Sequence, residues 1–236
     1  MLDANDTIKR AIVQRANKLQ YEKVYELIGG RPFILAGGAL CGDKVHDFDI
    51  YPSKANPYIR DEIERKLTDK TKPVGADIVA VTKNALTVLL EGGQTVQFCS
   101  YMKQSLTELV KSFDFAHIQV GILFQGDNRP PQIDSVFYTD DFVAANVTRC
   151  THYTGSEYPT SSIIRALKYY KRGKMNRSAA VRSVVHALAD MVNRGFADYN
   201  DFKDQLDAID LGLLPECHEA IMLHSAVSKA GLIRNK

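Results

Sequence analysis

The stretch PFILAGGALCGDKVHDFDIY, residues 32–51, decides the fold. It begins with an apolar run of strand length, breaks at a pair of glycines, Gly37 and Gly38, and ends in an alternating D-F-D-I-Y pattern. Side chains alternate between the two faces of a strand, so the acids of that pattern, Asp47 and Asp49, share one face. The apolar residues between them point into the core of a sheet. The stretch therefore predicts two strands connected through a glycine turn.

The paired acids predict a cation site. Two negative charges side by side are unfavourable unless a cation lies near them. Mg²⁺ is typically bound by one or two carboxylates together with phosphate oxygens. Gly37 and Gly38 lack a Cβ atom, so backbone N–H groups there can approach a phosphate, and a helix that begins at this point favours an anion. We expect a phosphate cradle and a metal site that face each other across a narrow gap.

The flanking sequence predicts a mixture of helices and strands. Residues 6–28 carry apolar side chains at three- and four-residue spacing, which indicates one or two amphipathic helices. Downstream, Pro57 opens a charged helix and the capping pair Ser105 and Glu108 begins another. Further strands are predicted at residues 76–82, 85–90, 95–99, 113–124 and 133–138.

After about residue 140 the pattern becomes purely helical. Start and stop signals predict helices at residues 162–172, 178–194, 200–209 and 215–229. We therefore expect an α+β protein with two domains: a mixed β-sheet flanked by helices in residues 1–140, and an all-helical domain in residues 141–236.

Composition restricts the class of protein. The 236 residues include 30 Lys and Arg against 28 Asp and Glu, so the chain as a whole is not a polycation that coats nucleic acid. Its four cysteines form no closely spaced pair, which indicates buried or free thiols rather than a structural zinc site. Neither a signal peptide nor a membrane-spanning stretch is found. Together with free thiols, this predicts a cytoplasmic protein without a membrane partner.

The combination of strand, glycine pair, short helix and apolar-flanked D-x-D resembles the nucleotidyltransferase superfamily that includes DNA polymerase β, poly(A) polymerases and CCA-adding enzymes. Gly37, Gly38, Asp47 and Asp49 match its motif directly. The resemblance implies Mg²⁺ (or Mn²⁺) and the transfer of a nucleoside monophosphate from a triphosphate such as ATP to an acceptor hydroxyl, with release of pyrophosphate. It also implies that the helical domain closes the nucleotide cleft.

Members of this superfamily carry a third carboxylate on a neighbouring strand. Gln97 occupies the expected position, and glutamine carries no charge. Asp114 is the preferred third catalytic metal ligand, because Phe113-Asp114 resembles a phage and microbial branch in which a Phe-Asp pair follows a helix. Asp77 is the second choice. The loss of an acid at residue 97 leaves a second hypothesis open, a catalytically silent protein that binds nucleotide on the same fold.

A basic stripe in the second half completes the expected site. Arg165, Lys168 and Arg172 recur at helical spacing on one face. The segment 161–170 resembles the superfamily helix that holds the triphosphate and base, which implies nucleotide contacts by Ser162, Arg165 and Lys168. A solvated face is the alternative. The apolar side of this helix is expected to comprise Ile163, Ile164, Leu167 and Tyr170.

The sequence leaves the acceptor open. A small molecule, a protein side chain and an RNA 3′ end are all compatible with the chemistry. The near-neutral charge of the chain fits the first two at least as well as the third.

Overall fold

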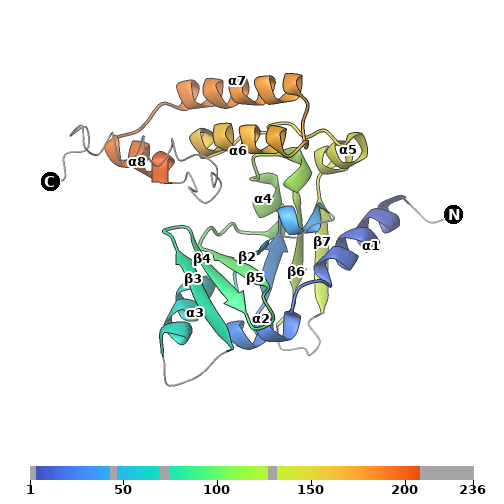
Figure 1. Cartoon of the computed structure of the whole chain (residues 1–236), viewed down its shortest axis with the longest axis vertical. Coiled ribbons are helices and arrows are strands. Elements are labelled where there is room, and N and C mark those ends of the chain that lie inside the picture. Colours follow the sequence, from blue (N-terminus) through green and yellow to red (C-terminus); the bar gives the residue numbers. More distant parts are fainter. Residues whose placement is uncertain (1–3, 43–46, 70–74, 127–131, 208–236) are drawn as a thin grey trace. The chain divides into compact units, whose positions relative to one another are not determined.

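One seven-stranded sheet organises the first of two units into which the chain divides, residues 1–155 and 156–236. The structure, a computed structural model, describes residues 4–42, 47–69, 75–126 and 132–207 (Figure 1). The strand order is β3-β4-β5-β2-β1-β6-β7, and every neighbouring pair is antiparallel except β2 with β5. The strands are β1 (Phe33–Ala36), β2 (Asp47–Tyr51), β3 (Ala76–Val81), β4 (Ala85–Leu90), β5 (Thr95–Cys99), β6 (Val120–Phe124) and β7 (Ile133–Tyr138).

The main core covers the sheet face opposite the paired acids. Helices α1 (Ala4–Ala16), α2 (Tyr21–Ile28) and α3 (Ile59–Thr68) bury their apolar stripes there. The strands contribute alternating apolar residues, including Phe48 and Ile50 of β2. The prediction of one or two helices before the first strand is therefore confirmed, as is the inward orientation of the apolar residues in the D-F-D-I-Y pattern.

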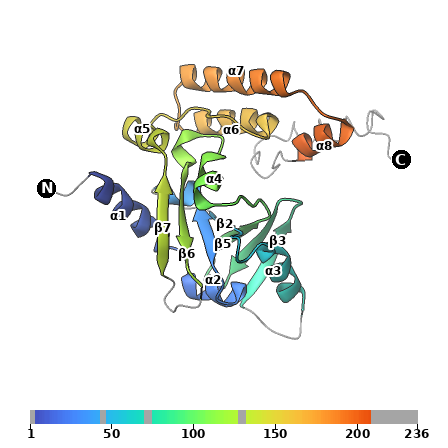
Figure 2. The same cartoon turned by 180° about the vertical axis from the view of Figure 1, so that it is seen from behind.

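A smaller core lies on the face that carries the acids. Helix α4 (Leu106–Lys111) begins at the expected N-cap, Ser105, whose side chain accepts a hydrogen bond from the backbone N–H of Glu108. The helix packs on β6 and β7 (Figure 2). A Cβ atom at Gly121 of β6 would lie 2.8 Å from Leu106 Cδ1, so the absence of a side chain lets α4 rest directly on the sheet.

The continuous strand expected at residues 113–124 was wrong in its first half. Only β6 joins the sheet, and a 3₁₀ turn, η2 (Ala116–Ile118), precedes it. The backbone before β6 pairs instead with a later segment: Ala116 N–H donates to His152 O, and Phe115 bridges Tyr153. A tertiary contact with residues about 40 positions away therefore overrides the local strand pattern.

Helix α5 (Asp140–Thr148) belongs to the first unit. It packs against η2, and its Phe142 enters the main core. The unit boundary therefore follows Gly155, whereas the change of pattern in the sequence comes near residue 140.

Three described helices form the second unit: α6 (Pro159–Lys171), α7 (Arg177–Arg194) and α8 (Tyr199–Asp207). Helices α6 and α7 pack through small buried residues, among them Ser162, Ala166, Ser183 and Ala187. The expected apolar side of α6 was wrong in part, because Leu167 and Tyr170 are 50% and 45% exposed. The helix expected at residues 215–229 lies outside the described residues. Among the described helices, none is long and apolar enough to cross a membrane.

Candidate functional site

The two acids of the D-x-D motif lie on one face of β2. Asp47 is exposed and Asp49 is half-buried, while Phe48 between them is buried on the opposite face. Antiparallel pairing sets Asp49 directly beside Ala36, the last residue of β1. The chain turns at the next residue, Gly37, and a Cβ atom built there would lie 3.7 Å from Asp49 Oδ2. The glycine turn and the carboxylate are therefore immediate neighbours.

The glycine turn is tight and needs a glycine at its first position. Gly37 has φ +84° and ψ −143°, a conformation that side chains disfavour. Its N–H donates to Val120 O, which ties the turn to β6. The N–H groups of Gly38 and Ala39 make no hydrogen bond to any residue that the structure describes. These two backbone donors follow directly after Gly37, the residue whose Cβ position lies next to Asp49.

The short helix expected to begin at this turn is present, but only as a 3₁₀ helix of three residues. The glycines open only a 3₁₀ turn, η1 (Gly38–Leu40), closed by Leu40 N–H to Gly37 O and Cys41 N–H to Gly38 O. So short a turn has little macrodipole, because the dipole is the sum of many aligned peptides. An anion here would be held by individual N–H groups rather than by a helix terminus.

Gln97 is the direct neighbour of Asp49 on the next strand. The parallel register of β2 and β5 pairs the two residues, so their side chains share one face. Gln97 Nε2 donates to Thr87 Oγ1 of β4 at 3.5 Å, a long hydrogen bond. The position at which the family resemblance implied a third acid is therefore beside the motif, and it holds a neutral amide.

Cys99 and Tyr51 are part of this face, although the motif did not include them. Burial raises the pKa of the Cys99 thiol well above its usual range, and the Asp49 carboxylate raises it further. A hydrogen bond with Tyr51 acts in the opposite direction. Strand periodicity could have identified Cys99, because it lies two residues after Gln97 on β5. A buried, protonated thiol therefore lies close to the paired acids.

Asp114 lies in the connection between α4 and η2 rather than on a strand of the acidic face. It is 2% exposed, and its backbone carbonyl accepts a hydrogen bond from Thr154 N–H. The neighbouring Phe113 ring approaches the Tyr51 ring, with centroids 5.7 Å apart. In the described part of the chain, no three His, Cys, Asp or Glu side chains lie close enough to hold one metal ion. Asp114 is thus near this region but does not form a three-acid cluster with the motif.

Asp77, the second choice for a third ligand, lies on the edge strand β3. Two strands separate β3 from β2 in the sheet order. With about 4.8 Å between neighbouring strands, Asp77 is about 14 Å from the motif. Asp77 therefore cannot share an ion with Asp49.

The expected nucleotide contacts of the second unit all lie on α6. Ser162 is completely buried, and its hydroxyl donates to Tyr158 O. A nucleotide contact requires an accessible group, so Ser162 is not part of the proposed nucleotide site. Arg165 and Lys168 are half-buried on the same helix.

The donor set on the acidic face suits one Mg²⁺ or Mn²⁺ ion. Hard divalent cations favour oxygen ligands, and two carboxylates leave coordination positions for phosphate oxygens. The same-face arrangement of Asp47 and Asp49 beside the glycine turn meets this requirement. For a second ion, the described residues around Asp49 offer the amide oxygen of Gln97 rather than another carboxylate.

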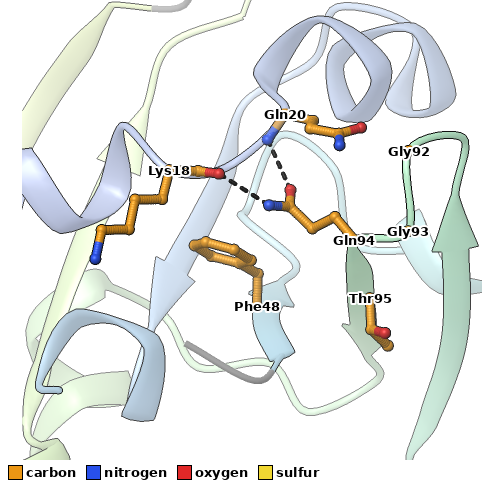
Figure 3. Close-up of a pocket in the computed structure, with 7 residues that line it drawn as sticks. All are labelled: Lys18, Gln20, Phe48, Gly92, Gly93, Gln94 and Thr95. Atoms are coloured by element: carbon orange, nitrogen blue, oxygen red, sulfur yellow. Dashed lines mark hydrogen bonds between the residues drawn. The ribbon is translucent and has the colours of Figure 1, made fainter. Parts of the chain in front are cut away.

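A separate hollow of about 380 Å³ lies where the α1–α2 connection meets the β4–β5 turn (Figure 3). Gln94 joins the two segments: its side-chain oxygen accepts a hydrogen bond from Gln20 N–H at 2.7 Å, and its amide nitrogen donates to Lys18 O at 2.8 Å. Phe48, on the sheet face opposite the acids, also lines the hollow. The polar groups of Gln94 are engaged in holding the two turns together, so we assign this region a structural role.

Comparison with known proteins identifies the fold. No protein-family model and no curated protein sequence matches this chain. Among solved structures, a CCA-adding enzyme in complex with ATP is similar, with 13% identity and a TM-score of 0.50 over 94% of this chain and 53% of that chain. The Thermotoga maritima CCA-adding enzyme complexed with tRNA has 15% identity and a TM-score of 0.48, over 89% and 50%. This chain thus spans about half the length of these enzymes. Its mixed sheet with flanking helices is a nucleotidyltransferase-type fold.

Proposed function

We propose that this protein is a metal-dependent nucleotidyltransferase, which moves a nucleoside monophosphate from a nucleoside triphosphate to an acceptor hydroxyl. The observation that carries the proposal is the contact between the glycine turn and the motif, where a Cβ atom at Gly37 would lie 3.7 Å from Asp49 Oδ2. A glycine turn whose N–H groups can donate hydrogen bonds to phosphate, next to carboxylates, suits a triphosphate bridged to a cation.

Each group has a distinct task in this proposal. Asp47 and Asp49 hold Mg²⁺ or Mn²⁺, which when bound neutralises charge on the triphosphate. The N–H groups of Gly38 and Ala39 donate hydrogen bonds to phosphate oxygens. Nucleotide contacts by Arg165 and Lys168 of α6 stay a prediction, which rests on the suitability of cationic side chains for phosphate oxygens.

The reaction exchanges one P–O bond for another. The acceptor oxygen attacks the α-phosphorus and forms a new P–O bond, while the bond from that phosphorus to the α–β bridging oxygen breaks. Pyrophosphate leaves with the bridging oxygen, and the hydroxyl proton passes to solvent. Most of the rate comes from position and from charge neutralisation, since the protein forms no covalent bond with the phosphoryl group.

Asp49→Asn tests the proposal. The purified chain is incubated with each α-labelled nucleoside triphosphate, Mg²⁺ or Mn²⁺ and mixed RNA, and label transfer and pyrophosphate release are measured. Loss of a metal ligand should reduce turnover by at least about 100-fold, because even outer-shell changes commonly cost 10- to 100-fold. Asp77→Asn is the matched control and should keep full activity, because Asp77 is an exposed acid on the same sheet about 14 Å from the motif. Undiminished turnover in Asp49→Asn would remove Asp49 from the mechanism.

The assignment of Asp114 as a third carboxylate stays a prediction. Asp114→Asn belongs in the same assay, with circular dichroism as a check on folding because Asp114 is buried. A large loss of turnover in a folded variant would support a role for this carboxylate in the reaction. Unchanged turnover would leave Asp47 and Asp49 as the acids of the site.

A catalytically silent nucleotide-binding protein is the second candidate function. The observation that favours it is the neutral Gln97 in register with Asp49, where an acid would serve a second ion. Equilibrium binding of the same labelled triphosphates distinguishes the two functions. Binding that requires Asp49 and Mg²⁺ but releases no pyrophosphate would favour the silent protein.

Charge in the second unit favours a nucleic acid strand as acceptor. Residues 158–189 contain no Asp or Glu but seven basic residues, so the rest of the chain holds 23 Lys and Arg against 28 acids. The most exposed of them lie at the α6–α7 connection and on α7: Lys171, Arg172, Lys174, Arg177 and Arg182. The near-neutral total therefore conceals a local basic surface, which suits a phosphate backbone.

Salt dependence tests this choice of acceptor. Transfer to RNA should fall steeply between 50 and 200 mM salt, because backbone binding releases counterions. The double variant Lys174→Ala, Arg177→Ala should weaken RNA binding and flatten its salt dependence, while leaving triphosphate binding unchanged. A salt-insensitive transfer reaction would favour a small-molecule or protein acceptor.

A further inference from the structure

Two aromatic side chains lie on the acidic sheet face, beyond Asp49 along β2. Tyr51 follows Asp49 by two residues, so both side chains share one face of the strand, about 7 Å apart along it. The Phe113 ring lies against the Tyr51 ring, with centroids 5.7 Å apart and planes inclined by 48°. Both residues are half-buried, so each keeps an accessible part. We call this pair of rings the aromatic shelf.

A buried network fixes the backbone of Phe113. Its carbonyl accepts hydrogen bonds from Gln119 Nε2 and from Thr154 Oγ1, each at 2.9 Å. Gln119 is 4% exposed, and its side-chain oxygen accepts a further hydrogen bond from Thr139 Oγ1 at 2.8 Å. The Phe113 ring is therefore carried by a backbone that is tied to two distant segments. A surface that is held in place before binding loses little entropy when a ligand arrives.

The aromatic shelf and the glycine turn lie on opposite sides of Asp49. Antiparallel pairing sets Ala36, the last residue of β1, beside Asp49. The glycine turn follows Ala36 and therefore extends toward Asp47. Tyr51 lies in the other direction along β2, opposite Ile34. In phosphoryl transfer the attacking and leaving oxygens are roughly in line. With pyrophosphate at the glycine turn, the acceptor therefore approaches from the side of the shelf.

We propose that the aromatic shelf binds the unpaired terminal base of a nucleic acid acceptor strand. The inference rests on the proposed function, from which it takes the place of the pyrophosphate. Bases of any sequence stack on aromatic side chains, because every base has a π face. The ribose attached to a base on the shelf would then lie between the shelf and Asp49, with its hydroxyl directed toward the proposed cation.

The charge around the shelf suits a phosphate backbone. Tyr101 packs on the same small core as the two rings of the shelf, and the Lys103 ammonium lies 5.0 Å from the centre of the Tyr101 ring. Residues 92–107, which comprise β5 and its flanking loops, contain no Asp or Glu. Lys111, in the last turn of α4, is exposed. Aromatic rings for bases together with cations for phosphates are typical of surfaces that bind single-stranded nucleic acid.

Leucine substitutions separate stacking from packing. Phe113→Leu and Tyr51→Leu keep an apolar side chain against the small core but remove the flat ring. Each should weaken binding of the acceptor end by about 5- to 150-fold, the range for loss of one base–aromatic stack. Phe113→Tyr and Tyr51→Phe keep a ring and should bind as the unmodified chain does.

Phe137→Leu is the matched control for these variants. Phe137 is another half-buried phenylalanine that packs on the same small core. It lies on β7, three strand spacings or about 14 Å from β2, so its ring is too distant to stack on a base beside Asp49. Its replacement should leave binding unchanged, and urea unfolding of each variant checks that the fold is retained.

A fluorescent RNA reports the stacking directly. The probe is an RNA hairpin with a short unpaired 3′ tail that ends in 2-aminopurine, whose fluorescence responds to stacking. The full chain is titrated into the probe in EDTA and without a nucleoside triphosphate, so the readout does not require transfer. We expect a fluorescence change on binding that both leucine variants diminish. A blunt-ended duplex of the same sequence should bind more weakly, because its terminal base is paired. Lys103→Gln should reduce the slope of log affinity against log salt by about 0.7, the value for one phosphate contact on a single strand.

Three results would overturn the proposal. Unchanged affinity and fluorescence response in both leucine variants would leave the rings with a packing role. Equal binding of the blunt duplex would assign the contact to the backbone alone. A response to 2-aminopurine riboside triphosphate that the leucine variants remove, without any response from the RNA probe, would make the shelf the site for the base of the triphosphate.

Failure of the proposed function gives a different result. Absence of label transfer in the unmodified chain, together with a probe response that depends on Phe113, would refute the proposed reaction and retain the shelf as a nucleic acid site. Label transfer that requires Asp49, together with a probe response that is indifferent to both rings, would retain the reaction and refute the shelf.

Discussion

Gln97→Glu places a third carboxylate beside the D-x-D motif and tests whether this face holds a cation. The register of β2 and β5 sets residue 97 next to Asp49, one strand spacing or about 5 Å away. At that distance, an effective dielectric constant between 20 and 80 gives a repulsion of about 1–3 kcal/mol. Asp49 is half-buried and Asp47 is exposed, so solvent screening favours the lower end of this range, about 1 kcal/mol.

The prediction has opposite signs without and with a divalent cation. Without one, Gln97→Glu should lower the free energy of unfolding by about 1 kcal/mol and the melting temperature by a few degrees. With millimolar Mg²⁺ or Mn²⁺, the added carboxylate becomes a ligand, so the variant should gain more stability from the metal than the unmodified chain does.

Urea unfolding with EDTA and with each metal measures both effects. Gln132→Glu is the matched control, because it adds the same charge at an exposed position. Gln132 precedes β7, an edge strand that β1 and β6 separate from β2. It should change little in either condition. No metal-dependent stabilisation of either chain would refute the idea that this face binds a cation, and equal stabilisation of both would place residue 97 out of reach of that cation.

The remaining predictions concern the glycine turn at Gly37, the hydrogen bonds of Gln94 and the thiol of Cys99. Gly37→Ala should lower the free energy of unfolding by about 1–3 kcal/mol, because φ +84° with ψ −143° is strained for alanine, and should weaken triphosphate binding in a titration. Gln94→Leu should cost about 1–2 kcal/mol in urea unfolding, because two backbone partners lose their hydrogen bonds; no change would mean that water replaces them. The raised pKa of Cys99 means that the folded chain holds this proton more tightly than the unfolded chain, so stability should fall as the pH rises above about 8.5. Cys99→Ala should reduce the dependence of stability on pH between pH 8 and 9.5. An identical pH dependence in the variant would contradict its attribution to Cys99.

Local patterns predicted most of the sheet and the order of its elements. Strands β4, β5 and β7 have the predicted bounds, because alternation and turn residues are properties of the local sequence. The same alternation placed Asp47 and Asp49 on one face, with Phe48 inside. The fold class followed from these patterns and from the resemblance of the motif, and the structural comparison supports it.

Strand order and register could not be read from local patterns. They depend on pairings between distant residues, such as Asp49 with Gln97, whose free energy is set by packing of whole strands. For the same reason, the segment before β6 left the sheet to pair with residues 152–154. The sequence did not indicate that Ser162 is buried. Its burial results from the close packing of α6 on α7, which a small side chain permits.

The sequence by itself determined that two carboxylates share a strand face and that a glycine pair ends the strand before them, since both follow from bond geometry and period. The tertiary structure alone decided which residues surround them. It set Gly37 against Asp49, brought Gln97 and Cys99 onto the same face, and moved Asp77 three strand spacings away. Proximity in a sheet is decided by the pairing of strands, and that pairing minimises a free energy summed over the whole core rather than over any one segment.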